Sequence, residues 1–166
     1  PGQDPRAWEE DLHAILELAV DHVSCYELSY EPGTALTRQK DAGRFPPEDP
    51  DRARALFERT RRICAERGYG QYEVSNYART GEACRHNLAY WRLLDYVGIG
   101  AGAASWRRGE RRKNLERPDA YEAAVKAGRD PVGESERTDP ATTLFDALMM
   151  GLRLPAEGVD LARARR

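Results

Sequence analysis

Apolar residues recur at helical spacing in three long stretches of the chain, which begin near residues 5, 50 and 140. Each stretch follows an Asp-Pro pair. The aspartate can cap free backbone N–H groups, and proline has no N–H to leave unpaired in the first turn. Gly68 and Gly158 come soon after the second and third stretches and are suited to end a helix. The pattern predicts three long helices and a shorter one at about 118–127.

Short runs rich in β-forming residues lie between these helices, at 22–29, 71–76 and 96–99, whereas 37–50 and 129–137 are predicted to be irregular. Alternation of strands and helices favours a parallel α/β sheet or barrel, in which functional groups gather at the carboxyl ends of strands. Three strands cannot close a barrel, and an open sheet leaves unpaired edges. We therefore expect the sequence to be incomplete at both ends.

Composition excludes several classes of protein. Charged residues make up 33% of the 166 residues, with a formal net charge of -2, so neither a nucleic-acid-binding arm nor a polybasic membrane patch is expected. No apolar run approaches the ~20 residues needed to span a bilayer, and the first residues do not form a secretory signal. These features predict a cytoplasmic protein without a nucleic-acid partner. The spacing of Cys25, Cys64 and Cys84 matches no metal site, which favours reduced thiols.

The densest cluster of chemically versatile residues lies in a predicted polar loop and comprises His86, Asn87, Tyr90 and Trp91. A neutral imidazole binds iron or zinc, an asparagine can fix its tautomer, and the aromatic rings can stack on a flat ligand. The alternative is structural: Tyr90 and Trp91 belong to the core, and His86 hydrogen-bonds a backbone carbonyl.

Two further motifs have open interpretations. Residues 98–103 formally match a dinucleotide-binding glycine motif, but no amphipathic helix follows, so the glycines are better explained by close approach of the backbone to a ligand or a strand. The basic cluster at 107–113 is either a rim facing an acidic ligand or a solvated turn.

Four motifs, in this order and at fitting distances, resemble the HemW family of radical-SAM haem chaperones, relatives of oxygen-independent coproporphyrinogen III oxidase. The motifs are Glu31-Pro-Gly-Thr34, Tyr72-Glu-Val-Ser-Asn-Tyr-Ala78, Arg85-His-Asn-Leu-Ala-Tyr-Trp91 and Asp95-Tyr-Val-Gly-Ile-Gly100. The resemblance implies the C-terminal part of a partial (β/α)6 radical-SAM barrel at 1–112. It also implies a linker and the start of a helical, winged-helix-like domain at 113–166.

The resemblance also implies ligands. Haem would be held by His86, Asn87, Tyr90 and Trp91, with His86 on the iron. S-adenosylmethionine would contact the strand ends at Leu28, Ser29 and Ile99. The family's Cys-x-x-x-Cys-x-x-Cys motif for a [4Fe-4S] cluster is absent, and no cysteine of this chain matches it. Thr80 stands where the family would have proline.

The function implied is haem binding and transfer to an acceptor protein, which could be membrane-associated. One alternative is oxidative decarboxylation of coproporphyrinogen III by a radical-SAM enzyme, so the question of enzymatic activity stays open, and no catalytic residue is assigned. A second alternative is an inactive fragment.

Overall fold

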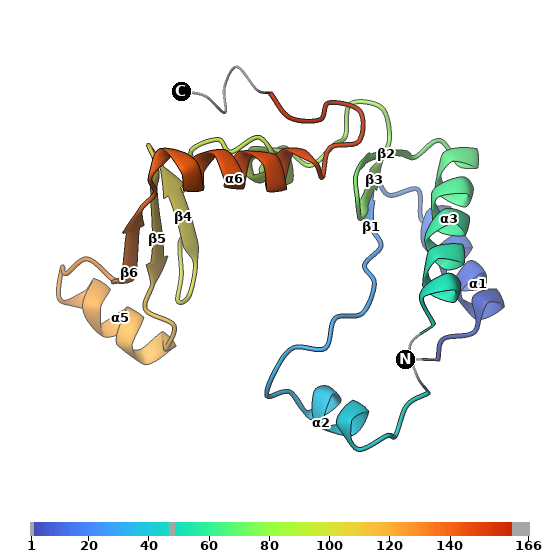
Figure 1. Ribbon diagram of the computed structural model, residues 1–166, viewed down its shortest axis with the longest axis horizontal. Coiled ribbons are helices and arrows are strands. Elements are labelled where there is room, and N and C mark those ends of the chain that lie inside the picture. The colour runs from blue at the N-terminus through green and yellow to red at the C-terminus, as the bar shows by residue number, and fades with distance from the viewer. Residues whose placement is uncertain (1, 47–48, 161–166) are drawn as a thin grey trace. The chain divides into compact units, whose positions relative to one another are not determined.

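The computed structural model describes residues 2–46 and 49–160. Its elements follow one another along the chain as shown in Figure 1: α1 (Pro5–Glu17), β1 (His22–Ser24), α2 (Ala35–Asp41), α3 (Pro50–Glu66), β2 (Gly70–Glu73), β3 (Asn76–Ala78), α4 (Arg85–Trp91), β4 (Ala104–Arg107), β5 (Glu110–Asn114), α5 (Pro118–Lys126), β6 (Val132–Arg137) and α6 (Pro140–Gly151). The chain divides into two compact units, Pro1–Ala83 and Cys84–Arg166. The predicted mixed α/β class is confirmed.

The first unit packs two helices on a small antiparallel sheet. Its strand order is β1-β3-β2, and α1 and α3 lie side by side (Figure 1). The shared core consists of Leu12, Leu16, Val23, Ile63, Cys64, Tyr69 and Tyr77, each at most 6% exposed. The apolar stripes of the two helices therefore meet the sheet, as amphipathic helices require.

Both long helices of this unit begin as predicted. The Asp4 carboxylate accepts hydrogen bonds from the backbone N–H groups of Arg6 and Ala7, and Asp49 does the same for Asp51 and Arg52. Gly68 has a φ of 82°, in the left-handed region that favours glycine after a helix. These local signals determined the helix starts correctly.

The predicted strands of the first unit need correction. The strand at 22–29 ends at Ser24, and 71–76 is not one strand but a hairpin of β2 and β3. The buried Glu73 carboxylate explains the turn, because it accepts from the backbone N–H of Ser75 at 2.6 Å and from Nδ2 of Asn76 at 2.5 Å. The predicted loop 37–50 includes most of α2, which Thr34 caps.

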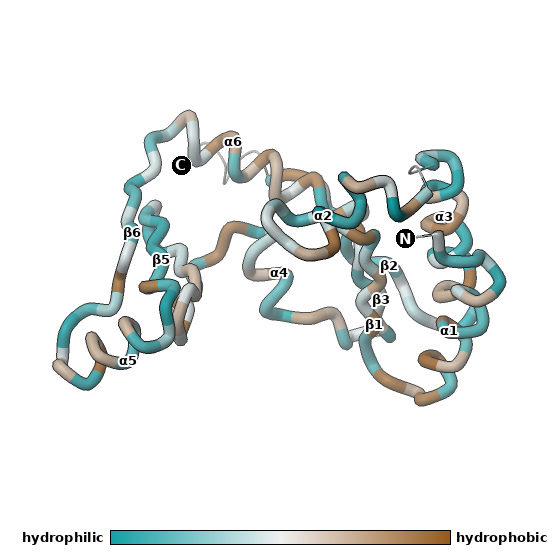
Figure 2. Tube along the Cα trace, turned by 90° about the horizontal axis from the view of Figure 1, so that it is seen from below, coloured by the Kyte–Doolittle hydropathy of each residue, from teal (hydrophilic) through white to brown (hydrophobic). Residues whose placement is uncertain are grey.

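The second unit is built on an antiparallel sheet of order β4-β5-β6. The basic cluster forms the β4–β5 hairpin, whose turn at Arg108 and Gly109 has positive φ at both residues. The expected linker at 129–137 contains β6, so that prediction was wrong. The predicted parallel pairing is wrong too, because every strand pair in the described part of the chain is antiparallel. Figure 2 shows that β5 is largely hydrophilic.

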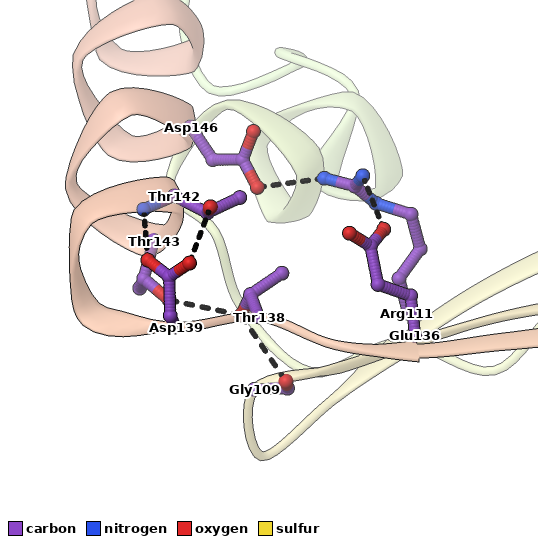
Figure 3. Close-up of polar contacts among 8 residues, drawn as sticks. All are labelled: Gly109, Arg111, Glu136, Thr138, Asp139, Thr142, Thr143 and Asp146. Atoms are coloured by element: carbon purple, nitrogen blue, oxygen red, sulfur yellow. Dashed lines mark hydrogen bonds and ion pairs between the residues drawn. The ribbon is translucent and has the colours of Figure 1, made fainter.

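A polar cluster joins this sheet to the start of α6 (Figure 3). Asp139 caps the helix by accepting from the backbone N–H of Thr142 at 2.8 Å. The Arg111 guanidinium binds the Asp146 carboxylate at 2.6 Å, and the Asp146 side chain is only 7% exposed. The Thr138 hydroxyl donates to the carbonyl of Gly109 at 3.2 Å. Polar contacts therefore link the hairpin to α6.

Helix α6 begins at the predicted Asp139-Pro140 pair. Phe145 on this helix is 64% exposed, and Leu152, which follows its last residue, is 71% exposed. The predicted domain boundary after Arg112 falls within β5, and the division into a barrel part and a helical part stays a prediction.

Candidate functional site

The segment that carries the candidate haem ligands is a helix and not the polar loop that the sequence predicted. Helix α4 runs from Arg85 to Trp91 and follows Cys84, which makes no side-chain capping bond. No glycine or proline interrupts residues 84–96, so nothing in the local sequence opposes a helical turn. Residues four apart lie on one helical face, and this spacing brings His86 and Tyr90 together.

His86 and Tyr90 form a hydrogen-bonded aromatic pair. The Tyr90 hydroxyl oxygen is 2.8 Å from Nε2 of His86, and the ring centres are 4.6 Å apart with an edge-to-face arrangement. The other side of Tyr90 meets Tyr96, at 4.4 Å between ring centres. Burial, with a smaller contribution from Tyr90, raises the pKa of the Tyr96 phenol. His86 itself is exposed and Tyr90 is half-buried. The exposed imidazole therefore packs against the half-buried ring of Tyr90.

Trp91 belongs to a different environment from His86. Five residues separate them, which corresponds to about 140° around an α-helix. The Arg153 guanidinium lies 4.3 Å from the centre of the Trp91 ring, and the indole Nε1 is buried without a hydrogen-bond partner. Trp91 lines a hollow of about 1030 Å³ within the second unit, together with Trp106 and Leu144.

The four predicted haem residues are therefore only partly brought together. His86, Asn87 and Tyr90 do not line the hollow that Trp91 lines. Asn87 is half-buried on the same helix. The geometry favours His86 and Tyr90 as one candidate site. Trp91 instead stacks with the Arg153 guanidinium.

The three residues expected to contact S-adenosylmethionine lie in two different units. Leu28 and Ser29 are exposed in the irregular segment that follows β1 in the first unit. Ile99 is 86% exposed in the glycine-rich turn of the second unit. The strand predicted at 96–99 is reduced to a single bridge between Tyr96 and Trp106.

Sequence reasoning missed the residues that hold this turn. Asn114 is 8% exposed, and its side-chain amide donates to the carbonyls of Gly98 at 3.3 Å and Gly100 at 2.9 Å. The only sequence signal for this role was weak: an uncharged polar residue at the end of an otherwise fully charged strand.

The cysteines do not form a cluster site. The pKa of the Cys25 thiol is lowered by its hydrogen bond with Cys64, and the same bond together with burial raises the pKa of Cys64. Cys84 lies in the other unit. Among residues 2–46 and 49–160, no group of three His, Cys, Asp or Glu side chains is placed to hold a metal ion. The residues present do not fit a [4Fe-4S] cluster.

Membrane insertion through a helix finds no support in the part of the chain that the structure describes. None of its helices combines the length and the apolar character that crossing a bilayer requires.

Comparisons with known proteins identify relatives over nearly the whole chain. The heme chaperone HemW of Synechocystis sp. is 35% identical over 167 residues, covering 98% of this chain and 40% of that protein. The mitochondrial radical S-adenosyl methionine domain-containing protein 1 of Bos taurus is 35% identical, covering 92% of this chain and 36% of that protein. Heme chaperone HemW of Escherichia coli is 43% identical over 95 residues, which are 56% of this chain and 24% of that protein. No family model matches the chain.

A solved structure shows the same fold. Coproporphyrinogen III oxidase (HemN) from Escherichia coli, a radical-SAM enzyme, matches with a TM-score of 0.70 at 17% identity, over 93% of this chain and 38% of that one. The predicted part of a radical-SAM barrel agrees with this match. The chain spans about two fifths of the length of the curated relatives it matches. On these sequence relationships, and over the part of its relatives' length that it spans, the chain belongs to the HemW family of radical-SAM proteins.

Proposed function

We propose that this chain carries the haem-binding part of a haem chaperone and that His86 is the iron ligand. The observation that supports this most is the exposed imidazole on α4, which packs edge-to-face against the Tyr90 ring with 4.6 Å between ring centres. A neutral histidine is a common axial ligand of haem iron. The name of the Synechocystis relative, a heme chaperone, supports the same cargo.

The aromatic pair would serve as a contact surface for the porphyrin. Tyr90 is held between His86 and Tyr96 by two edge-to-face contacts, so its ring is pre-oriented before haem arrives. Asn87, on the same helix, would complete the polar part of the site. Trp91 would contribute through the hollow that it lines beside Arg153, and this contribution is separate from that of His86.

We also propose that Leu28, Ser29 and Ile99 contact S-adenosylmethionine. The exposed Ile99 side chain offers an apolar surface to a flat adenine ring. When bound, this cofactor would supply the adenosyl chemistry of radical-SAM proteins. The cysteines of this chain do not fit the iron–sulfur cluster, so no step of the proposed function runs through one.

After binding, the haem would be transferred to another protein. We place the protein in the cytoplasm, where its haem would pass to an acceptor protein, including acceptors at a membrane. An exposed ligand supports transfer, because an acceptor can approach an iron whose protein ligand is at the surface without unfolding the donor.

The test is a haem titration of the 166-residue chain and of His86→Ala, with the haem absorption band as the readout. We expect the wild-type chain to bind one haem and the variant to lose the band or shift it. His13→Ala is the matched control, since it removes a half-buried histidine of the first unit that contacts Arg67. An unchanged spectrum and stoichiometry in His86→Ala would exclude this ligand.

Two alternatives need tests of their own. Because this chain has no residues that fit the cluster, the enzymatic alternative is tested on a reconstituted protein that also carries the three-cysteine motif. It is incubated anaerobically with coproporphyrinogen III, and we expect no protoporphyrinogen. An inactive fragment would bind haem no better than His86→Ala. Circular dichroism should show a cooperative unfolding transition, and its absence would favour that second alternative.

A further inference from the structure

The glycine-rich turn at residues 98–100 is held in place by side chains from three separate elements. It lies outside any strand, Ile99 within it is 86% exposed, and the preceding Val97 is 67% exposed. An irregular glycine-rich segment of this kind has high conformational freedom and would not hold one shape by itself. Something else must fix it.

The main-chain polar groups of both flanking glycines are bonded to side chains. The N–H of Gly98 donates to the Ser105 hydroxyl on β4 at 2.9 Å, and the N–H of Gly100 donates to the Tyr121 hydroxyl on α5 at 3.1 Å. The carbonyls of both glycines accept from Asn114 at the end of β5. Four groups of the turn are therefore satisfied by three side chains.

Asn114 is the centre of this arrangement. It is buried, its two carbonyl partners lie on either side of Ile99, and its own backbone N–H donates to the carbonyl of Ala103 at 3.0 Å. The register of the β5–β6 pair shifts between Lys113 and Asn114. A register shift of this kind can re-aim a side chain, and here it accompanies an amide directed at the turn and not at the neighbouring strand.

The turn also requires glycine. A Cβ on Gly98 would lie 2.2 Å from the backbone oxygen of Ala104, and Gly100 has a φ of 112°. The backbone therefore approaches β4 more closely than any other residue would allow. Close approach and the bonds to Asn114 together force the side chain of Ile99 outward into solvent.

We propose that Asn114 and Tyr121 are positioning residues that hold the 98–100 turn so that Ile99 is presented to the adenine of S-adenosylmethionine. This proposal rests on the proposed function, because it takes Ile99 as a contact of that cofactor. Neither residue touches the ligand in this proposal. They act through the turn, which they keep in its binding conformation before the ligand arrives, and this lowers the entropic cost of binding.

Two variants test the positioning role in the 166-residue chain. Asn114→Asp keeps the volume of the side chain but replaces its N–H donor with an oxygen that faces two carbonyl oxygens. Tyr121→Phe removes only the acceptor for the N–H of Gly100 and is the milder change if Asn114→Asp fails to fold. Tyr69→Phe is the matched control, since it removes a hydroxyl that donates to the carbonyl of Val20 at 2.6 Å in the first unit.

The measurement is an NMR titration with S-adenosylmethionine that follows the amide signals of residues 98–102. In the wild-type chain these signals should shift and saturate. We expect at least about tenfold weaker binding in Asn114→Asp, about threefold in Tyr121→Phe, and no change in Tyr69→Phe, since one net hydrogen bond corresponds to about a two- to tenfold effect. Hydrogen exchange at the amides of Gly98 and Gly100 should accelerate in parallel.

Haem binding by the same variants separates positioning from general damage. Haem affinity should stay within about twofold of wild type, because His86 and Tyr90 lie on α4 and pack against each other and Tyr96, and neither Asn114 nor Tyr121 takes part in these contacts. Faster exchange with unchanged S-adenosylmethionine affinity would overturn the positioning role. A wild-type chain whose turn signals do not respond would overturn the contact itself. Weaker haem binding in the variants than in the wild-type chain would mean general damage to the unit and would also overturn the positioning role. A wild-type chain that binds no haem would count against the proposed function alone.

Discussion

The hydroxyl oxygen of Tyr90 lies 2.8 Å from Nε2 of His86, so this imidazole nitrogen is already engaged in a hydrogen bond. Either the phenol donates to Nε2 or the N–H of Nε2 donates to the phenol oxygen. In both cases iron binding through Nε2 must first break this bond. In the proposed site, haem would therefore have to compete with Tyr90 for the imidazole.

Tyr90→Phe should consequently bind haem more tightly. Loss of the hydroxyl frees Nε2, and because a hydrogen bond contributes ~0.5–1.5 kcal/mol net, the haem Kd should fall about two- to tenfold. The measurement is a haem titration followed by absorbance. Tyr96→Phe is the control, because it keeps the ring against Tyr90 and leaves the bond to His86 intact. Weaker binding in Tyr90→Phe would mean that the hydroxyl assists the bound haem.

Arg111→Ala should destabilise the second unit. The change leaves the carboxylate of Asp146, 7% exposed, without its guanidinium partner (Figure 3). An unpaired buried polar group costs ~1–3 kcal/mol in the free energy of unfolding. Urea denaturation of the 166-residue chain measures this cost.

Arg112→Ala provides the comparison for Arg111→Ala. Arg112 pairs with Asp130, whose side chain is 60% exposed, and exposed ion pairs contribute at most about 1 kcal/mol. Equal losses in the two variants would show that the burial of Asp146 does not matter. Restoring the charge with Arg111→Lys should recover only part of the loss, since lysine has a single nitrogen where arginine contacts both Asp146 and Glu136.

Leu12→Ala should destabilise the first unit. Leu12, on α1, is fully buried in the core of this unit. Removing a buried leucine side chain costs about 2–5 kcal/mol. Leu18→Ala, at a position that is 73% exposed, should change the free energy of unfolding by no more than about 0.5 kcal/mol. Thermal and urea denaturation measure both. A small effect at Leu12 would show that the core of this unit is not closed by α1.

Acid should weaken the second unit. The Arg92 guanidinium holds the pKa of Glu157 below its usual range, and the backbone N–H of Thr142 does the same for Asp139. A carboxyl whose pKa is lowered by folding stabilises the protein fully above its unfolded pKa, and this contribution disappears as the pH falls through the folded pKa. The free energy of unfolding should therefore be smaller at about pH 3 than at neutral pH.

Asp139→Asn separates capping from titration. Asparagine caps a helix about as well as aspartate but does not ionise, so stability at neutral pH should be retained and the loss in acid reduced. Urea denaturation at both pH values gives the comparison. Identical pH dependence in the variant and the wild-type chain would assign the acid sensitivity to other carboxyls, of which Glu157→Gln tests the first.

Much of the candidate site was predictable and its arrangement was not. The sequence identified His86 and Tyr90 as chemically versatile neighbours, but it placed them in a loop, because short polar helices have little apolar periodicity to reveal them. The prediction that Trp91 joins them came from proximity along the chain and from the resemblance to the HemW family. Helical geometry and the stacking on Arg153 place Trp91 in the lining of a hollow that His86 and Tyr90 do not line.

The sequence by itself determined the helix starts at Asp4, Asp49 and Asp139, since a cap is formed by residues two or three positions apart and needs no distant partner. It also indicated the family, because the four motifs can be recognised from the order of their residues without knowledge of the fold. Only the tertiary structure decided that the strands pair antiparallel, that β6 joins the sheet, and that Asn114 reaches back to Gly98 and Gly100. Those contacts join residues far apart along the chain, and their energy depends on burial and geometry that no local pattern encodes.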